Sequence, residues 1–217
     1  MLDRYGIGLQ GFWVHPGELN EQSQMILDLL ERHNIQAELW VLIPDPPGQT
    51  HQERVEAAVE QLRPLAQAAA EIGCSIGLYN HLGWFGEPEN QLAIIEAMQM
   101  DNVGIVYNLH HGHHQMDRFA QLLEKMQPHL MCLNLNGMVD AADPGEHKIL
   151  PIGYGERDLE ILQTIIDSGY DGPIGILGHT MDDVEERLQD NLDGLDWLKQ
   201  QLRGEDAGDR PQMRTHP

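Results

Sequence analysis

The sequence is poor in cysteine, and no stretch of it stays apolar for long. Its two cysteines, Cys74 and Cys132, lie in apolar runs without CxxC or other ligand spacing, so we expect buried free thiols in a reducing compartment. No window approaches the roughly 18 apolar residues that a membrane span requires. These absences predict a cytoplasmic protein that does not enter a membrane, and they leave open whether a leader precedes Met1.

Basic residues are also scarce. The chain has 13 lysines and arginines against 35 aspartates and glutamates, which gives a formal net charge of −22 over 217 residues. This charge keeps a protein soluble but repels phosphate backbones and anionic lipid surfaces, so we expect no nucleic-acid partner. The length is typical of one α/β domain with a sizeable core.

The sequence does contain a regular alternation of short apolar runs with segments that have apolar residues at helical spacing. The runs that predict strands are residues 7–14, 37–43, 75–80, 103–109, 130–136 and 173–178. The segments that predict helices are residues 20–33, 52–72, 90–98, 116–126, 157–168 and 182–202. Because the strand runs are apolar almost throughout, we expect a parallel sheet that is buried on both faces.

Six βα units fit either a (β/α) barrel or an open doubly wound sheet. An open sheet with a nucleotide site usually carries a glycine-rich turn, but no GxGxxG or GxxxxGK motif follows any predicted strand, and this favours the barrel. We assign residues 1–203 to the barrel domain. Residues 204–217 have no apolar face to bury, and we expect them to form a disordered tail.

Histidine, asparagine and tryptophan recur where the predicted strands end, and in parallel βα folds the loops at these ends form the functional site. The residues are Trp13, Asn80, His81, Asn108, His111, Asn134, Asn136 and His179. Since loops are polar in any case, chance could supply about half of this pattern. The asparagines inside apolar runs are more informative, because a buried amide without partners costs about 1–3 kcal/mol. We expect them to face a polar cavity.

The loop after the third predicted strand, HLGWFGEPENQ, adds aromatic and acidic residues to the same rim. Trp84 could stack on the C–H face of a sugar while Glu87 binds its hydroxyls; alternatively, Trp84 only caps the barrel. Glu89 is best explained as a first-turn charge that suits the helix dipole. For His81 we favour a functional role, because a neutral imidazole after a buried strand can transfer protons near pH 7.

Gly153 and Gly155 form a weaker signal, because glycine pairs are common in turns. They precede a predicted helix, where their backbone amides would bind a phosphate or a carboxylate if one were presented.

Four stretches carry a further pattern: IGCSIGLYNHLGWFGEPEN, NVGIVYNLHHGH, PHLMCLNLNGM and KILPIGYGERDLEILQTIIDSGYDGPIGIL. Together they resemble the xylose-isomerase-like TIM barrels, a superfamily of sugar-phosphate isomerases and epimerases that also contains the endonuclease IV type of DNA repair enzyme. YNH, YNLHHGH, LNLNGM and GILGH are similar to a bacterial subgroup within it. The resemblance covers residues 37–202 and implies an eight-stranded barrel, of which the first two βα units are missing here. We expect a partner, such as a second copy, to cover the exposed sheet edges.

The resemblance also implies a divalent cation held by a Glu, an Asp, two His and a final Glu. The residues at these positions are Tyr79 or Asn80, Asn108, His111, Asn134, and Leu177 or Gly178. Only His111 matches, and without the carboxylates a site for Mn, Mg, Co or Zn is in doubt. A site made of imidazoles from His81, His111 and His179 stays open, as does the alternative that these histidines bind substrate.

We therefore predict a sugar or sugar-phosphate isomerase/epimerase that transfers a proton next to a carbonyl, with His81, His111 and Glu87 as catalytic groups. The strand-end asparagines would hold hydroxyl groups, Trp13 and Trp84 would stack on the sugar, and His179 would contact it. The alternative is a degenerate barrel that binds a carbohydrate without turnover, which the missing carboxylates favour. An abasic-site endonuclease needs a zinc-ligand cluster and a basic face, and the sequence supplies neither.

Overall fold

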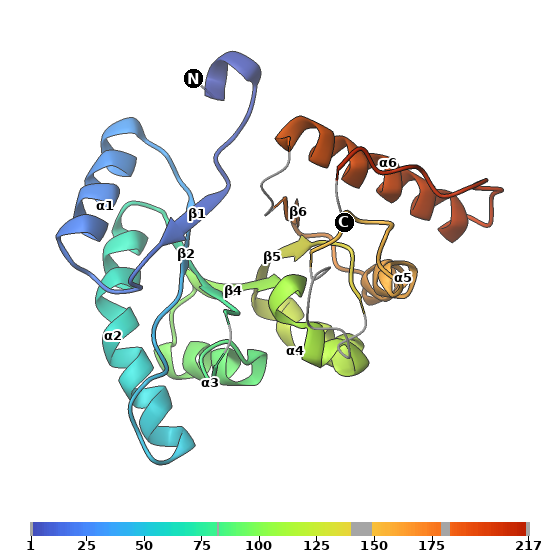
Figure 1. Cartoon of the computed structure of the whole chain (residues 1–217). Coiled ribbons are helices and arrows are strands. Elements are labelled where there is room, and N and C mark those ends of the chain that lie inside the picture. The colour runs from blue at the N-terminus through green and yellow to red at the C-terminus, as the bar shows by residue number, and fades with distance from the viewer. Residues whose placement is uncertain (1, 82, 140–148, 179–182, 216–217) are drawn as a thin grey trace. The chain divides into compact units, whose positions relative to one another are not determined.

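The computed structural model describes residues 2–81, 83–139, 149–178 and 183–215 (Figure 1). In these residues the strands are β1 (Gly11–Val14), β2 (Glu38–Val41), β3 (Ser75–Tyr79), β4 (Val103–Asn108), β5 (Leu130–Leu135) and β6 (Ile174–Ile176). The α-helices are α1 (Glu21–His33), α2 (His51–Glu71), α3 (Pro88–Met98), α4 (Phe119–Met126), α5 (Asp158–Ser168) and α6 (Val184–Leu202). Short 3-10 helices are η1 (Leu2–Tyr5), η2 (Leu109–His111), η3 (His113–Arg118) and η4 (Gln127–His129). The predicted alternation of six strands with six helices is confirmed.

The chain divides into two compact units. The N-terminal unit comprises Met1–Val106 with His129–Met131, and the C-terminal unit comprises Tyr107–Pro128 with Cys132–Pro217. The strands have the sheet order β1-β2-β3-β4-β5-β6. The pairs β1/β2, β2/β3 and β3/β4 are parallel, and so is β5/β6. The parallel pairing expected from the apolar runs is therefore confirmed, and each βα unit returns the chain to the same end of the sheet.

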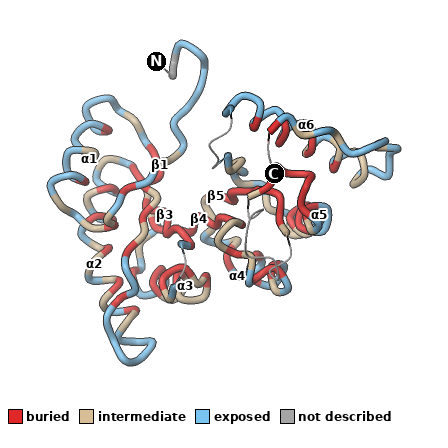
Figure 2. The backbone as a smooth tube through the Cα atoms, viewed as in Figure 1, coloured by how far each residue is buried: buried red, intermediate tan, exposed pale blue. Residues whose placement is uncertain are grey.

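In the N-terminal unit, one face of the strands is fully buried. Leu39 and Val41 of β2 and Ile76 and Leu78 of β3 have no exposed surface. The helices supply the cover, since α1 and α2 lie beside β1 and β2 in Figure 1 and the buried backbone concentrates in the strands in Figure 2. Helix starts are fixed locally: the Asn20 side chain accepts hydrogen bonds from the amides of Gln22 and Ser23 at the start of α1.

In the C-terminal unit, α4 and α5 pack on each other and α5 packs on α6. Their buried faces are apolar at helical spacing: Phe119, Leu122, Leu123 and Met126 on α4, and Ile161, Leu162 and Ile165 on α5. Within the ranges that the structure covers, no helix is both long enough and apolar enough to span a membrane.

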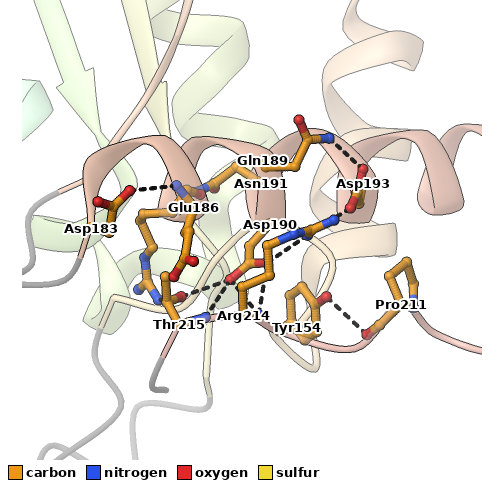
Figure 3. Close-up of polar contacts among 11 residues, drawn as sticks. Tyr154, Asp183, Glu186, Gln189, Asp190, Asn191, Asp193, Pro211, Arg214 and Thr215 are labelled. Carbon is orange, nitrogen blue, oxygen red and sulfur yellow. Dashed lines mark hydrogen bonds and ion pairs between the residues drawn. The ribbon is translucent and has the colours of Figure 1, made fainter.

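The segment that follows α6 returns along that helix. Trp197 Nε1 donates to the carbonyl of Gly208 at 3.2 Å, and farther along the tail the hydroxyl of Tyr154 donates to the carbonyl of Pro211 at 2.8 Å (Figure 3). This differs from the disordered tail that we expect from the sequence. The physical reason is that the contacts are polar, so an apolar face is not required to hold the segment.

Asp190 of α6 is the centre of these contacts. Its carboxylate is fully buried and accepts hydrogen bonds from the backbone amides of Arg214 (3.0 Å) and Thr215 (2.9 Å) and from the Thr215 hydroxyl (2.7 Å). The Arg214 guanidinium also pairs with it at 2.9 Å, and the buried Arg187 donates to Thr215 Oγ1. Burial alone would raise the pKa of the Asp190 carboxyl, but the hydrogen bonds from Arg214 and Thr215 outweigh it and hold this pKa below its ordinary value.

The contacts of Asp190 predict that the attachment of residues 208–215 to α6 weakens at low pH. A carboxyl whose pKa is lowered by folding stabilises the folded state above the ordinary aspartate pKa, and this contribution is lost as the pH falls through the lower, folded value. We expect Asp190→Asn to remove that dependence and to speed hydrogen exchange of the amides in residues 208–215 at neutral pH. Hydrogen exchange with mass spectrometry measures both effects. Asp196→Asn, at an exposed position on the same helix, is the control and should leave tail exchange unchanged.

Candidate functional site

Three aromatic side chains gather at the carboxyl ends of β1, β2 and β3. The strand register places Trp13 beside Trp40 and Trp40 beside Gly77, and Tyr79 lies two residues beyond Gly77 on the same face. The Trp13 and Tyr79 ring centroids are 4.9 Å apart, and the Trp40 ring is stacked with Tyr79 at 6.4 Å and 15°. Tyr79 is buried, whereas Trp13 is 56% exposed. We name Trp13, Trp40 and Tyr79 the aromatic platform.

Two glycines and a carboxylate hold Trp40 in place. A Cβ at Gly11 would come within 2.6 Å of Trp40 Nε1, and one at Gly77 within 3.2 Å of Trp40 Cδ1, so both positions leave the room that the indole fills. Glu38 Oε2 accepts a hydrogen bond from Trp40 Nε1 at 2.9 Å, and Glu38 Oε1 accepts one from Gln10 Nε2 at 2.6 Å. The indole N–H is thus satisfied inside the protein, and the orientation of the ring is fixed before any ligand arrives.

Of these three residues, the sequence predicts Trp13 as part of the site, and Tyr79 enters only as a position matched to a family ligand. Trp40 is not predicted. The run AELWVLI is apolar on both faces, so its pattern does not show which face a given residue takes. A signal is present nonetheless: Glu38 is the one charged residue in that run and stands two residues before Trp40, on the same face. A carboxylate at a strand position that is otherwise apolar marks a hydrogen-bonded partner nearby.

The loop after β3 carries the other predicted residues of the N-terminal unit. Asn80 is buried at the end of the strand, whereas His81 is exposed. Glu87 is half-buried at the N-cap of α3 and makes no side-chain capping bond. The Trp84 ring lies 5.4 Å from the His51 ring, and the Arg54 guanidinium lies 5.9 Å from its centroid, so α2 already engages this indole. These contacts fix the loop against α2.

The predicted residues of β4 and the turn after it form a second group, in the C-terminal unit. Asn108 is buried, and its side-chain oxygen accepts a hydrogen bond from the backbone amide of His110 at 3.0 Å, which caps η2. The His110 ring lies 4.6 Å from the ring of His111 and 6.3 Å from that of His113. His111 is half-buried, and His113 Nδ1 lies 3.2 Å from the carbonyl of Val139. The HHGHH stretch is therefore a folded turn whose imidazoles meet in tilted and edge-to-face contacts.

Two further asparagines lie at the end of β5. Asn134 is buried close to the backbone of β6, since a Cβ at Gly175 would meet its side-chain oxygen at 2.2 Å. The Asn136 amide donates to the carbonyl of Gly137 at 2.9 Å. The expected burial of the strand-end asparagines is thus observed at Asn80, Asn108, Asn134 and Asn136. His179, which the sequence also assigns to the site, lies outside the described residues.

The backbone amides of Gly153 and Gly155, just before α5, already bind an anionic group. Asp158 is buried, and its carboxylate accepts hydrogen bonds from the amides of Met138 (2.7 Å), Gly153 (2.7 Å) and Gly155 (2.9 Å). Burial raises the pKa of the Asp158 carboxyl above its usual range, although the three amide donors oppose the shift. The amides of Gly153 and Gly155 thus bind a carboxylate of the protein itself.

The donor groups do not fit the divalent cation that the resemblance implies. Across the ranges that the structure covers, no group of three or more His, Cys, Asp and Glu side chains could hold a metal ion. Of the positions matched to the family's ligands, only His111 carries the family's residue type, and neutral amides stand at Asn80, Asn108 and Asn134. Mg²⁺ and Mn²⁺ prefer carboxylate oxygens, so these amides are weak substitutes.

Comparison with known proteins agrees with the fold. The family model for the xylose isomerase-like TIM barrel matches residues 10–201, and the chain belongs to this family. The predicted barrel of six βα units is therefore confirmed. None of the curated protein sequences compared matches the chain.

Solved structures with this fold include two sugar epimerases. The 3-keto-D-glucoside 4-epimerase of E. coli is 18% identical with a TM-score of 0.63, covering 91% of this chain and 81% of that one. An L-ribulose 3-epimerase is 12% identical with a TM-score of 0.64, covering 88% and 68%. A xylose isomerase-like TIM barrel protein from Mycobacterium smegmatis, in complex with magnesium, is 17% identical with a TM-score of 0.61, covering 93% and 76%. At these identities the likeness concerns the fold.

The Asp158 contacts predict a stability effect. Asp158→Ala would leave three buried amides without an acceptor, at about 1–3 kcal/mol each, so we expect a loss of at least about 3 kcal/mol in the free energy of unfolding. Urea denaturation measures it. Glu160→Ala, which removes an exposed partner of Arg157, should change the stability by less than about 0.5 kcal/mol. Equal effects of the two substitutions would contradict the structural role of Asp158.

Proposed function

We propose that this protein binds a small carbohydrate or sugar phosphate at the carboxyl ends of its strands and acts on it as an isomerase or epimerase. The observation that carries the proposal is the aromatic platform. A half-exposed indole on a pre-oriented aromatic group is the surface on which the C–H face of a sugar ring stacks. Membership of a family whose solved structures include sugar epimerases agrees with it.

The buried amides supply the polar half of such recognition. An asparagine side chain offers both an acceptor and two donors, which suits the paired hydroxyl groups of a sugar. In the proposal Asn80, Asn108, Asn134 and Asn136 bind hydroxyls, Trp13 and Trp84 stack on the sugar as the sequence predicts, and Trp40 extends the stacking surface. His179 remains assigned as a ligand-contacting residue.

The proposed chemistry is proton transfer next to a carbonyl. A base removes the proton from the carbon beside the carbonyl, and the electron pair moves to the carbonyl oxygen as an enediolate forms. In epimerisation the proton returns to the same carbon on its opposite face. In isomerisation it goes to the former carbonyl carbon, while the hydroxyl proton of the neighbouring carbon moves to the former carbonyl oxygen and leaves the new carbonyl behind. Imidazole accepts and returns protons near neutral pH, so His81 and His111 are assigned as proton carriers, with Glu87 as a second acid or base. The scheme contains no step on a metal ion, because the amides at the positions matched to the family's ligands do not fit a divalent cation.

The second candidate is a barrel that binds a carbohydrate without turnover. The observation that favours it is the loss of carboxylates at the matched ligand positions, because amides bind hydroxyls well but stabilise an enediolate less than a cation does. The two candidates share the same recognition and differ only in whether the C–H bond breaks.

Sugar binding tests the proposal that both candidates share. Isothermal titration or ligand-observed NMR with a panel of monosaccharides and their phosphates should identify a ligand that the chelator-treated protein still binds. We expect Trp13→Ala and Trp40→Ala to weaken that binding by about tenfold each, because a stacked ring contributes on the order of 1 kcal/mol. Trp197→Ala, on α6, is the matched control and should bind normally. If no sugar binds, or if all three variants lose binding equally, the aromatic platform is not the recognition surface.

Solvent exchange separates the enzyme from the binding module. In D₂O, an isomerase or epimerase incorporates deuterium at the carbon next to the carbonyl of a bound sugar, and NMR detects it. We expect His81→Gln and His111→Gln to slow the incorporation by about 100-fold or more, whereas His33→Gln, at the C-terminus of α1, should not. The measurement is repeated after chelation and with added Mn, Mg, Co or Zn. A sugar that binds but never exchanges under any of these conditions establishes the second candidate.

A further inference from the structure

The exposed apolar side chains of this protein are not scattered. In the described ranges, the large apolar residues that are exposed are Tyr5, Ile7, Leu9, Trp13, Leu19, Met25, Leu29, Leu159, Ile166, Ile174, Val184, Leu188 and Leu192. They lie in η1, β1, α1 and the segments that join them at one end of the βα series, and in α5, β6 and α6 at the other. The intervening helices α2, α3 and α4, which are fully described, expose none.

The two outermost helices each carry an apolar stripe on their exposed side. On α1, Met25 is 72% exposed and Leu29 is 50% exposed, one helical turn apart. On α6, Val184, Leu188 and Leu192 are 77%, 48% and 40% exposed and are spaced by four residues. A solvent-facing helix normally carries polar residues there, so both stripes are suited to a packing partner.

The strands at the two ends are open in the same way. β1 pairs only with β2 and β6 only with β5 in the described sheet, and Ile174 on β6 is 50% exposed. Natural proteins cover such edges, because their free N–H and C=O groups pair readily with another strand. Since all the described pairs are parallel, a β6 strand placed beside a β1 strand in the same direction continues the existing pattern.

The two stripes also match in spacing. Met25 and Leu29 are four residues apart, as are Leu188 and Leu192. If the helices lie side by side in the same direction with these pairs facing each other, His33 at the end of α1 comes level with Asp196 of α6, which Lys199 also contacts at 2.9 Å. Polar side chains of both helices then border an apolar centre, which is the usual arrangement of a protein interface.

We propose that the β1/α1 end of one copy of this chain docks against the β6/α6 end of a second copy, head to tail. Each copy carries one surface of each kind, so the contact satisfies an open edge on both molecules. The docking covers the apolar stripes and extends the sheet across the contact. It places β6 of the second copy next to β1, the strand that carries Trp13. The net charge of −22 on each copy opposes the association, and salt screens that repulsion.

Self-association of the purified chain, with two double variants, tests this proposal. Analytical ultracentrifugation and native mass spectrometry should show that the wild type associates, and more strongly as NaCl rises from about 50 to about 500 mM. Met25→Lys with Leu29→Lys disables one surface, and Leu188→Lys with Leu192→Lys disables the other. Because each variant removes two apolar side chains that the docking would bury, we expect each to self-associate at least about 100-fold more weakly than the wild type.

Mixing the two variants is the decisive step. A head-to-tail contact leaves one intact pair of surfaces between the two variants, so the mixture should form a one-to-one heterodimer that neither variant forms alone. A contact between like ends would not be rescued by mixing. Gln67→Lys with Gln121→Lys, on the exposed sides of α2 and α4, adds the same charge and should associate like the wild type.

Circular dichroism and thermal unfolding of each variant establish that it is folded before the sizes are compared. A wild type that remains monomeric at every salt concentration overturns the proposal, and so does association that survives in both double variants. Failure of the heterodimer to appear while the wild type associates also overturns it, because another surface then carries the contact.

Discussion

Burial of the inner strands, β2 to β5, is the constraint on which this structure depends. A strand of a parallel sheet has helices against one face, and its other face must also be filled. In the N-terminal unit the first requirement is met by residues such as Leu39 and Ile76, which have no exposed surface. The second is met by Trp40 and Tyr79, which are large enough to fill space that aliphatic side chains would leave empty.

This constraint also explains how the candidate site is built. Trp40 can lie against the sheet because Gly11 has no Cβ and Gly77 leaves it further room, and its polar edge can be buried because Glu38 accepts the indole hydrogen bond. The same side chains that fill the inner face of the strands therefore present an aromatic surface at their carboxyl ends. Packing and recognition use one set of residues, so a substitution at Gly77 would affect both.

The sequence predicts the strands and helices well because burial produces a recognisable pattern of apolar residues. A buried strand is an apolar run, and a helix packed on one side has apolar residues at helical spacing. The prediction fails where contacts are polar and distant along the chain. Asp158 occupies the amides of Gly153 and Gly155, and Asp190 holds the segment after α6, but neither contact produces a periodic pattern. Trp40 is overlooked for a related reason, since a run that is apolar on both faces does not show which residues face inward.

The charges near the candidate site bear on the nature of the ligand. The residues assigned to recognition are asparagines, tryptophans and histidines, with Glu87 the only charged one and no lysine or arginine among them. The amides of Gly153 and Gly155, which the sequence suggests for a phosphate, are occupied by the Asp158 carboxylate, and the whole chain carries a charge of −22. A phosphate dianion would thus approach a repulsive field and meet no fixed cation in the assigned set. Under the proposed function, neutral hydroxyl groups would meet the asparagine amides, so an unphosphorylated sugar is a better chemical match to the assigned residues than a sugar phosphate.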